Sequence, residues 1–157
     1  MTRESRGTGP SPPPPPSRAQ PMVGPRVFTV DEANALVPRF EQAFESIDAL
    51  RAQLRATKIK LTALEMIWGG ELQKTDCPDR GEVASLVEQL KELEERFQAV
   101  LAELAQESVT VKDVELGLVD VYHVREGRLV NLCWKRGEEA IVAWHHVDEG
   151  FAGRAPL

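Results

Sequence analysis

The sequence has few of the residues that mark an exported or membrane-bound protein. Only two of its 157 residues are cysteine, Cys77 and Cys133. No apolar run approaches the roughly 18–20 residues that a membrane span requires. The N-terminal stretch MTRESRGTGPSPPPPPSRAQ lacks the apolar core of a signal peptide. We therefore expect a cytoplasmic protein without membrane contact, in which both cysteines are free thiols rather than a disulfide.

Positive charge is also scarce in the part of the chain that we expect to fold. Residues 1–26 hold four of the 19 Lys and Arg residues and one of the 25 Asp and Glu residues. Residues 27–157 therefore hold 15 basic and 24 acidic residues, a net charge of −9. Such an acidic fold repels the phosphate backbone, and no basic stripe is concentrated enough to overcome this repulsion. We expect no nucleic-acid partner.

Residues 1–26 have no apolar anchor with which to build a core. The run Pro12–Pro16 favours polyproline II, and the residues around it are rich in Ser, Gly and Arg. A ligand for an SH3-like or WW-like groove is one interpretation of this stretch. A solvated leader is the simpler one, and we predict a disordered Pro/Ser/Arg-rich tail. Residues 27–157 then form a single α+β domain.

Helical signals begin at Thr29. Thr29 and Glu32 match a capping box, in which the hydroxyl and the carboxylate each satisfy a free N–H at the helix start. Apolar residues then recur at spacings of three and four as far as Trp68, and Gly69–Gly70 ends the pattern. Pro38 lies inside this pattern, so we predict a kink there rather than an end.

A second run with the same spacing covers residues 82–106, after a polar loop over residues 71–81. Two long helices joined by a short loop predict an antiparallel helical hairpin over residues 29–106, with coiled-coil-like packing. The two helices of one hairpin cannot fully bury each other's apolar stripes and also cover one face of a sheet. We therefore weigh a dimer, or another protein partner, equally with a monomer.

The period changes from 3.6 to 2 after the second helix, which predicts a three-stranded antiparallel β-meander within residues 109–157. A short β segment or an extended lead-in over Val109–Val111 precedes it. Gly127 and Gly137 mark the two turns. The predicted strands are Leu118–Arg125, Arg128–Lys135 and Ala140–His146.

If both turns contain two residues, the register of the three strands is fixed. One face then carries the rows Val119–Trp134–Ile141, Val121–Leu132–Ala143 and His123–Val130–His145 and packs on the hairpin. The opposite face carries the rows Asp120–Cys133–Val142, Tyr122–Asn131–Trp144 and Val124–Leu129–His146. This second face is too apolar to be simply solvated, so we expect it to meet the N-terminal segment, the C-terminal tail, a partner subunit or a ligand.

Most residues capable of chemistry fall in this C-terminal region. Asp120, Cys133 and His145 are competent metal ligands. However, the adjacent His145 and His146 point to opposite faces, and no CxxC or HExxH motif is present. We therefore commit to no metal and predict no cofactor, with His145, Cys133 and Asp120 as the candidate ligands should a metal bind. The candidate cluster consists of Asp120, Tyr122, Cys133, Trp134, Glu138, Trp144, His145 and Arg154.

Two relationships within the cluster follow from its charges. Asp120 lies opposite Cys133 in the assumed register, and a neighbouring carboxylate raises the pKa of a thiol. This favours a buried, unreactive Cys133. Glu138 and Arg154 carry opposite charges and can form an ion pair that closes the C-terminal tail over the sheet.

Four segments of the chain occur together in the order of a known family, and they are FTVDEANALVP (28–38), VKDVELGLVDV (111–121), LCWKRGE (132–138) and AWHHVDEGFAGRAPL (143–157). With these motifs the chain resembles the bacterial family catalogued as domain of unknown function 2203. The resemblance covers residues 27–157, with Val121 in place of the family's Phe and His146 as an extra histidine. It implies a small cytoplasmic protein and supplies no activity. Its signature residues would be Asp120, Cys133, Trp134, Glu138, His145 and Arg154.

No catalytic constellation is assembled by the motifs, so a non-enzymatic binding or assembly module is the leading hypothesis for function. The alternative is a small enzyme or metalloprotein that uses the region of Asp120, Cys133 and His145. A third hypothesis is a small-molecule sensor that uses Tyr122 and Trp144. The sequence identifies no substrate, ligand or partner.

Overall fold

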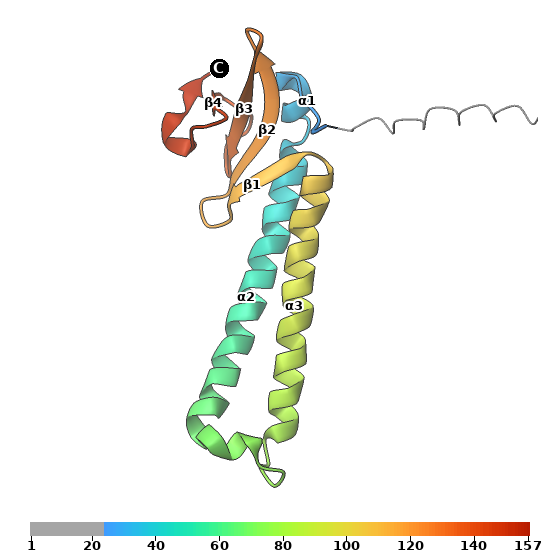
Figure 1. The fold of residues 1–157 in the computed structure, drawn as a ribbon, viewed down its shortest axis with the longest axis vertical. Coiled ribbons are helices and arrows are strands. Elements are labelled where there is room, and N and C mark those ends of the chain that lie inside the picture. The colour runs from blue at the N-terminus through green and yellow to red at the C-terminus, as the bar shows by residue number, and fades with distance from the viewer. Residues whose placement is uncertain (1–23) are drawn as a thin grey trace, which may run out of the picture.

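The computed structural model describes residues 24–157 and consists of a long helical hairpin that carries an antiparallel sheet at its open end. Figure 1 shows the sheet packed at one end of the hairpin, while the loop between the two long helices lies at the other end. The α+β class is confirmed. The prediction of a disordered tail over residues 1–26 falls outside the described residues, except for residues 24–26.

The helical region begins as predicted. Thr29 Oγ1 accepts from the backbone N–H of Glu32 at 3.2 Å, and Glu32 Oε2 accepts from the backbone N–H of Thr29 at 2.8 Å. This capping box starts a short helix, α1 (Val30–Asn34). Two N–H groups at the helix start are thereby satisfied.

The prediction of one helix kinked at Pro38 is corrected by the structure. α1 ends at Asn34, and a separate helix, α2 (Val37–Trp68), begins three residues later. Pro38 lies in the first turn of α2. Backbone N–H groups in the first turn have no acceptor within the helix, so the absence of an N–H in proline costs no hydrogen bond there. The fixed φ of proline also suits the helical conformation.

The predicted hairpin is confirmed. A 3₁₀ turn (Gly69–Gln73) follows α2, and α3 (Arg80–Gln106) returns alongside it. The indole N–H of Trp68 donates to Asp79 Oδ2 at 2.7 Å and fastens the connecting loop. The buried side chains of α2 are concentrated in the half nearest the sheet, and they are Val37, Phe40, Ala43, Phe44, Ile47, Leu50 and Thr57.

The sheet has five antiparallel strands in the order β1-β2-β3-β4-β5, which corrects the predicted three-stranded meander. Both additional strands are at the edges of the sheet, where β1 extends the short segment expected over Val109–Val111 and β5 has only two residues, too few to show a period of 2. The last of them forms because the C-terminal tail turns back, with the N–H of Leu157 donating to Val142 O at 3.0 Å. The strands are β1 (Val109–Asp113), β2 (Leu118–Arg125), β3 (Arg128–Lys135), β4 (Ala143–His146) and β5 (Ala155–Pro156).

The register of β2 and β3 is the predicted one. Val119 pairs with Trp134, and Asp120 pairs with Cys133. The turn between them places Glu126 at φ 51° and Gly127 at φ 75°. Positive φ at both central residues matches the right-handed twist of the flanking strands.

The register of β3 and β4 differs from the prediction by one residue. Leu132 pairs with Trp144, not with Ala143, and Asn131 pairs with His145. Residues 136–142 form an irregular connection in place of a two-residue turn. Because side chains alternate along a strand, this shift places His145 on the face of Asp120 and Cys133 rather than beside His123.

The hydrophobic core lies between the hairpin and the face of the sheet that carries Val119, Val121, Leu132 and Trp134. Trp134 is fully buried there, with its ring centroid 5.5 Å from that of Phe40 and 6.1 Å from that of Phe44. The core thus fixes one face of the sheet, and the opposite face carries the polar residues described below.

Candidate functional sites

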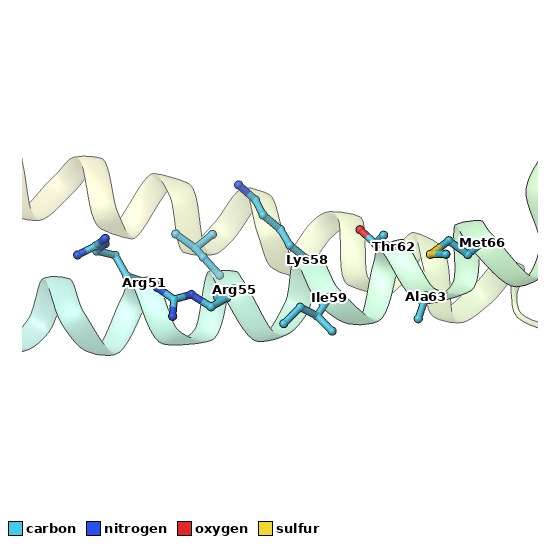
Figure 2. Close-up of a pocket in the computed structure, with 8 residues that line it drawn as sticks. Arg51, Arg55, Lys58, Ile59, Thr62, Ala63 and Met66 are labelled. Atoms are coloured by element: carbon cyan, nitrogen blue, oxygen red, sulfur yellow. The ribbon is translucent and has the colours of Figure 1, made fainter. Parts of the chain in front are cut away.

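One candidate surface is a groove along the half of α2 that points away from the sheet. Figure 2 shows its side chains arranged along this one helix. The groove has a volume of about 630 Å³. Ile59 is 63% exposed and Met66 is 82% exposed, which is unusual for large apolar side chains. The lining residues are Arg51, Leu54, Arg55, Lys58, Ile59, Thr62, Ala63 and Met66.

Sequence reasoning did not find this groove, because Ile59 and Met66 lie outside the apolar stripe that faces α3. A signal was nevertheless present. The spacing of seven residues between them places both side chains on one flank of the helix.

The second candidate is a cluster of Asp120, Cys133 and His145 on the face of the sheet opposite the core. These residues come from β2, β3 and β4, and their exposed fractions are 4%, 1% and 1%. One possible ligand atom from each residue lies within 4.8 Å of the other two. The structure therefore brings together the three residues that the sequence identified as competent metal ligands.

His145 is held on both sides of its ring. Its Nδ1 lies 2.8 Å from the backbone oxygen of His146, and its Nε2 lies 3.1 Å from Asp120 Oδ2. A carbonyl oxygen only accepts hydrogen bonds, so Nδ1 carries a hydrogen. The two contacts together fix the orientation of the imidazole ring.

Cys133 is a neutral thiol at ordinary pH. Burial, followed by the negative charge of Asp120, raises the pKa of its thiol to about 12. This agrees with the expectation of an unreactive cysteine. His145 is bonded to Asp120 rather than to the thiol, so nothing in the cluster activates Cys133 as a nucleophile.

Asp120 connects the cluster to the surface. Its Oδ1 atom is buried and has no hydrogen-bond partner among residues 24–157. The carboxylate also lines a hollow of about 80 Å³. The other lining residues are Thr110, Lys112, Tyr122, Asn131 and Val147. Tyr122 is the only further member of the predicted cluster in this hollow.

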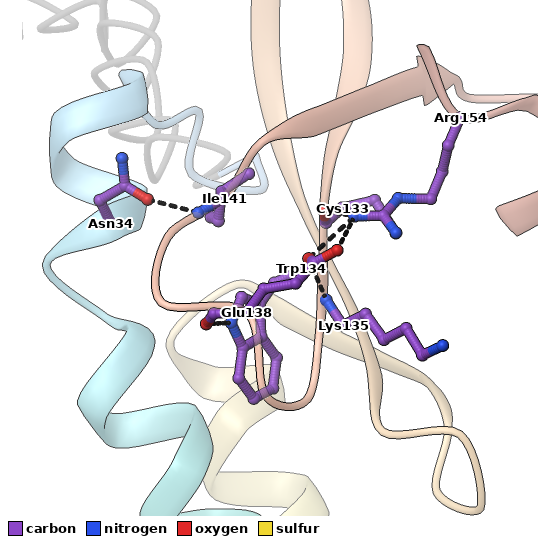
Figure 3. Close-up of polar contacts among 7 residues, drawn as sticks. All are labelled: Asn34, Cys133, Trp134, Lys135, Glu138, Ile141 and Arg154. Atoms are coloured by element: carbon purple, nitrogen blue, oxygen red, sulfur yellow. Dashed lines mark hydrogen bonds and ion pairs between the residues drawn. The ribbon is translucent and has the colours of Figure 1, made fainter. Parts of the chain in front are cut away.

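The predicted ion pair between Glu138 and Arg154 is confirmed and lies next to Cys133 (Figure 3). Arg154 Nη2 donates to both carboxylate oxygens of Glu138, at 2.7 and 2.8 Å, and to the backbone oxygen of Cys133 at 3.2 Å. Glu138 Oε2 also accepts from the N–H of Lys135 at 2.8 Å. This network attaches the C-terminal tail to β3.

Two members of the predicted cluster lie on the other face of the sheet. Trp134 is in the core and donates its indole N–H to the backbone oxygen of Glu138 at 2.8 Å. Trp144 packs edge-on against His146, at a centroid distance of 5.1 Å, with the guanidinium of Arg125 5.0 Å above its ring. The shifted register of β4 thus separates Trp144 from Tyr122.

Sequence reasoning also missed the surroundings of Trp144. Together with Arg125 and Arg128 it lines a hollow of about 500 Å³ at the tip of the sheet. The sequence did show that the two arginines flank the predicted turn between β2 and β3. The incorrect register of β4 placed Trp144 on the opposite face, so its proximity to these arginines was not predicted.

No helix in the described residues is long and apolar enough to cross a membrane. No curated protein and no solved structure matches the chain. One family matches, described as an uncharacterized conserved protein (DUF2203), and its model covers residues 26–157. The chain belongs to the DUF2203 family, as its motifs indicated.

Proposed function

We propose that the protein is a non-enzymatic assembly module that self-associates through the exposed groove of α2. The observation that carries this proposal is the apolar surface of the groove, where Ile59 and Met66 are mostly exposed. Large apolar side chains that gather in one exposed groove, rimmed by polar residues, are a feature of interaction sites. The proposed occupant is a second copy of the chain.

The packing of the hairpin supports this. The apolar stripe of α2 beyond Thr57 continues through Leu61, Leu64 and Trp68, and each of these side chains is only half-buried. A single partner helix covers one side of such a stripe. A second hairpin would bury the remainder and complete a four-helix arrangement.

Charge complementarity supports a second copy as the occupant. Residues 51–66 of α2 carry four basic side chains and one acidic side chain, Glu65. Residues 88–95 of α3 carry four glutamates and one basic side chain, Lys91. Lys58 and Glu94 already approach to 3.8 Å within one chain. Placing α2 on α3 of a second copy would pair these opposite charges, which favours that arrangement over α2 on α2.

The chemistry of the sheet supports a function without catalysis by Cys133. The raised pKa of Cys133 opposes a thiolate, and the bond between His145 and Asp120 leaves the imidazole without a nucleophile to deprotonate. We also propose a cytoplasmic location, since Cys77 and Cys133 are both free thiols.

The test is the molar mass of the full chain, measured by size-exclusion chromatography with light scattering. We expect twice the chain mass of 17.5 kDa for the wild type, and the mass of one chain for the double variant Ile59→Glu/Met66→Glu. Glutamate is a good helix former, so the exposed helix should persist. The matched control is Val124→Glu, which changes a half-exposed apolar residue on the sheet. It should remain a dimer.

Two results would overturn the proposal. One is a wild-type protein that stays monomeric at every concentration tested. The other is a dimer that survives the double substitution on α2 but is lost in the Val124→Glu control, because the interface would then lie on the sheet.

A further inference from the structure

The cluster on the sheet contains a contradiction in its hydrogen bonding. His145 donates through Nδ1 to the backbone oxygen of His146, so a ring with a single hydrogen presents a lone pair at Nε2. That lone pair faces Asp120 Oδ2 at 3.1 Å, and an ionised carboxylate is also only an acceptor. Two acceptors do not attract each other, so this contact requires a positive species: a second proton on the imidazole ring or a metal ion bound by both side chains.

We propose that this species is a divalent transition-metal ion, held by Asp120 through its carboxylate, Cys133 through Sγ and His145 through Nε2. The chemical class that fits best is Zn²⁺, because thiolate, imidazole and carboxylate are together its usual ligands in proteins. This site is independent of the proposed self-association, since none of the three residues lies on α2.

The geometry of the cluster is compatible with such an ion. Bond lengths of roughly 2.0–2.3 Å in a tetrahedral site place ligand atoms about 3.3–3.8 Å apart. The three ligand atoms of the cluster lie within 4.8 Å of one another. The widest separation therefore needs to shorten by about 1 Å, while His145 Nε2 and Asp120 Oδ2, which are 3.1 Å apart, need to separate slightly to admit the ion. The ligands come from three neighbouring strands, so the backbone around the site is already fixed.

The ion would also satisfy atoms that the protein alone leaves without partners. Asp120 Oδ1 is buried without a hydrogen bond among the described residues, and a bound cation beside this carboxylate would compensate its charge. Coordination would convert the buried thiol of Cys133 to a thiolate as its proton leaves to water. The desolvated negative charges of the two side chains would then face a positive ion.

The surroundings have the form expected of outer-shell support. The hydrogen bond from His145 Nδ1 to a backbone oxygen is the arrangement that orients metal-binding histidines. Arg154 holds the backbone oxygen of Cys133 and is itself held by Glu138. These contacts would give Glu138 and Arg154 positioning roles.

The hollow beside Asp120 supplies a path from solvent to the site. Its volume of about 80 Å³ has room for water, and polar side chains of Lys112, Tyr122 and Asn131 line it. Three protein ligands with a water in the fourth position is the pattern of an open zinc site. The fourth position would therefore be a water that enters from this hollow.

The experiment uses the full chain, stripped with a chelator and titrated with Co²⁺, a spectroscopic substitute for Zn²⁺. We expect one ion per chain and a thiolate-to-cobalt charge-transfer band in the near ultraviolet. Zn²⁺ should abolish this band by displacement. The chain has two cysteines, so a band that persists in the Cys77→Ser variant can come only from Cys133. This variant changes a loop thiol outside the sheet and should fold normally.

The absence of a charge-transfer band in the wild type would overturn the proposal, because a proton shared by His145 and Asp120 would then be the positive species. Loss of the band in Cys77→Ser would also overturn it, since the cobalt ion would then be bound by the thiolate of Cys77 and not by that of Cys133. The roles of the other ligands are measured with Asp120→Asn. Once circular dichroism shows this variant to be folded, its affinity for Co²⁺ should be at least tenfold weaker, and an unchanged affinity would remove Asp120 from the site.

Discussion

Asn34, the last residue of α1, accepts a hydrogen bond through its side-chain Oδ1 from the backbone N–H of Ile141 at 2.7 Å (Figure 3). This contact joins the first helix to the connection between β3 and β4. Ile141 is consequently held in the core instead of continuing β4. β4 begins at Ala143, with His145 on the same face as Asp120. A helix-terminal amide thus helps to determine which residues form the buried cluster.

Asn34→Ala should destabilise the fold by about 1–3 kcal/mol, because it leaves the buried N–H of Ile141 without its partner. The measurement is the free energy of unfolding from urea titration. Gln53→Ala is the control, since it removes an exposed amide from α2 and should change stability by no more than about 0.5 kcal/mol. Equal effects of the two substitutions would mean that the Asn34 contact contributes nothing specific.

Trp134→Ala should destabilise the protein by about 3–5 kcal/mol, because it opens a cavity between the sheet and the rings of Phe40 and Phe44. Urea unfolding again provides the measurement. Trp144→Ala is the comparison. Because the Trp144 indole is only partly buried, this substitution should lower the free energy of unfolding by less. A larger loss for Trp144 than for Trp134 would contradict the assignment of the core face.

Glu138→Gln should lower the unfolding free energy by about 1–3 kcal/mol, since it leaves the mostly buried Arg154 guanidinium without a carboxylate. A double-mutant cycle with Arg154→Met isolates the coupling between the two side chains. The exposed pair Lys58 and Glu94 provides a control, in which Glu94→Gln should cost about 0–0.5 kcal/mol. Equal costs at the two sites would show that burial of the Glu138–Arg154 pair is irrelevant to its strength.

Local patterns explain which parts of the fold could be predicted from the sequence. The capping box of Thr29 and Glu32 acts over three residues, and the helix stripes repeat within a few turns. The register of β2 and β3 follows from a two-residue turn at Glu126–Gly127, where short-range geometry alone decides the pairing. The position of Asp120 opposite Cys133 could therefore be predicted.

The position of His145 could not be predicted in the same way. It depends on the irregular connection over residues 136–142 and on the contact of Ile141 with Asn34, which is 107 residues away in the sequence. No local pattern encodes that contact. A shift of one residue then exchanges the faces of β4, so a small error in a loop becomes a large error in the site. The edge strand β5 was missed because two residues cannot show a period.

The stability of the metal-free protein should fall as pH rises from about 9 to about 12. Burial and the charge of Asp120 raise the pKa of Cys133 from 9.0 to about 12. The folded state therefore keeps the thiol proton at a pH where the unfolded chain has released it. A raised folded-state pKa contributes stability that is complete below the unfolded-state pKa and is lost as pH rises through the folded-state value.

Other groups titrate in the same range, so the measurement is the difference in unfolding free energy between the wild type and Cys133→Ala, followed from pH 7 to pH 11 in the presence of a chelator. The stability advantage of the wild type should shrink with pH, because only the wild type carries the buried thiol. Cys77→Ala is the control, and its difference from the wild type should stay level over the same range. A wild-type advantage over Cys133→Ala that is constant with pH would show that the thiol is not held neutral by its surroundings.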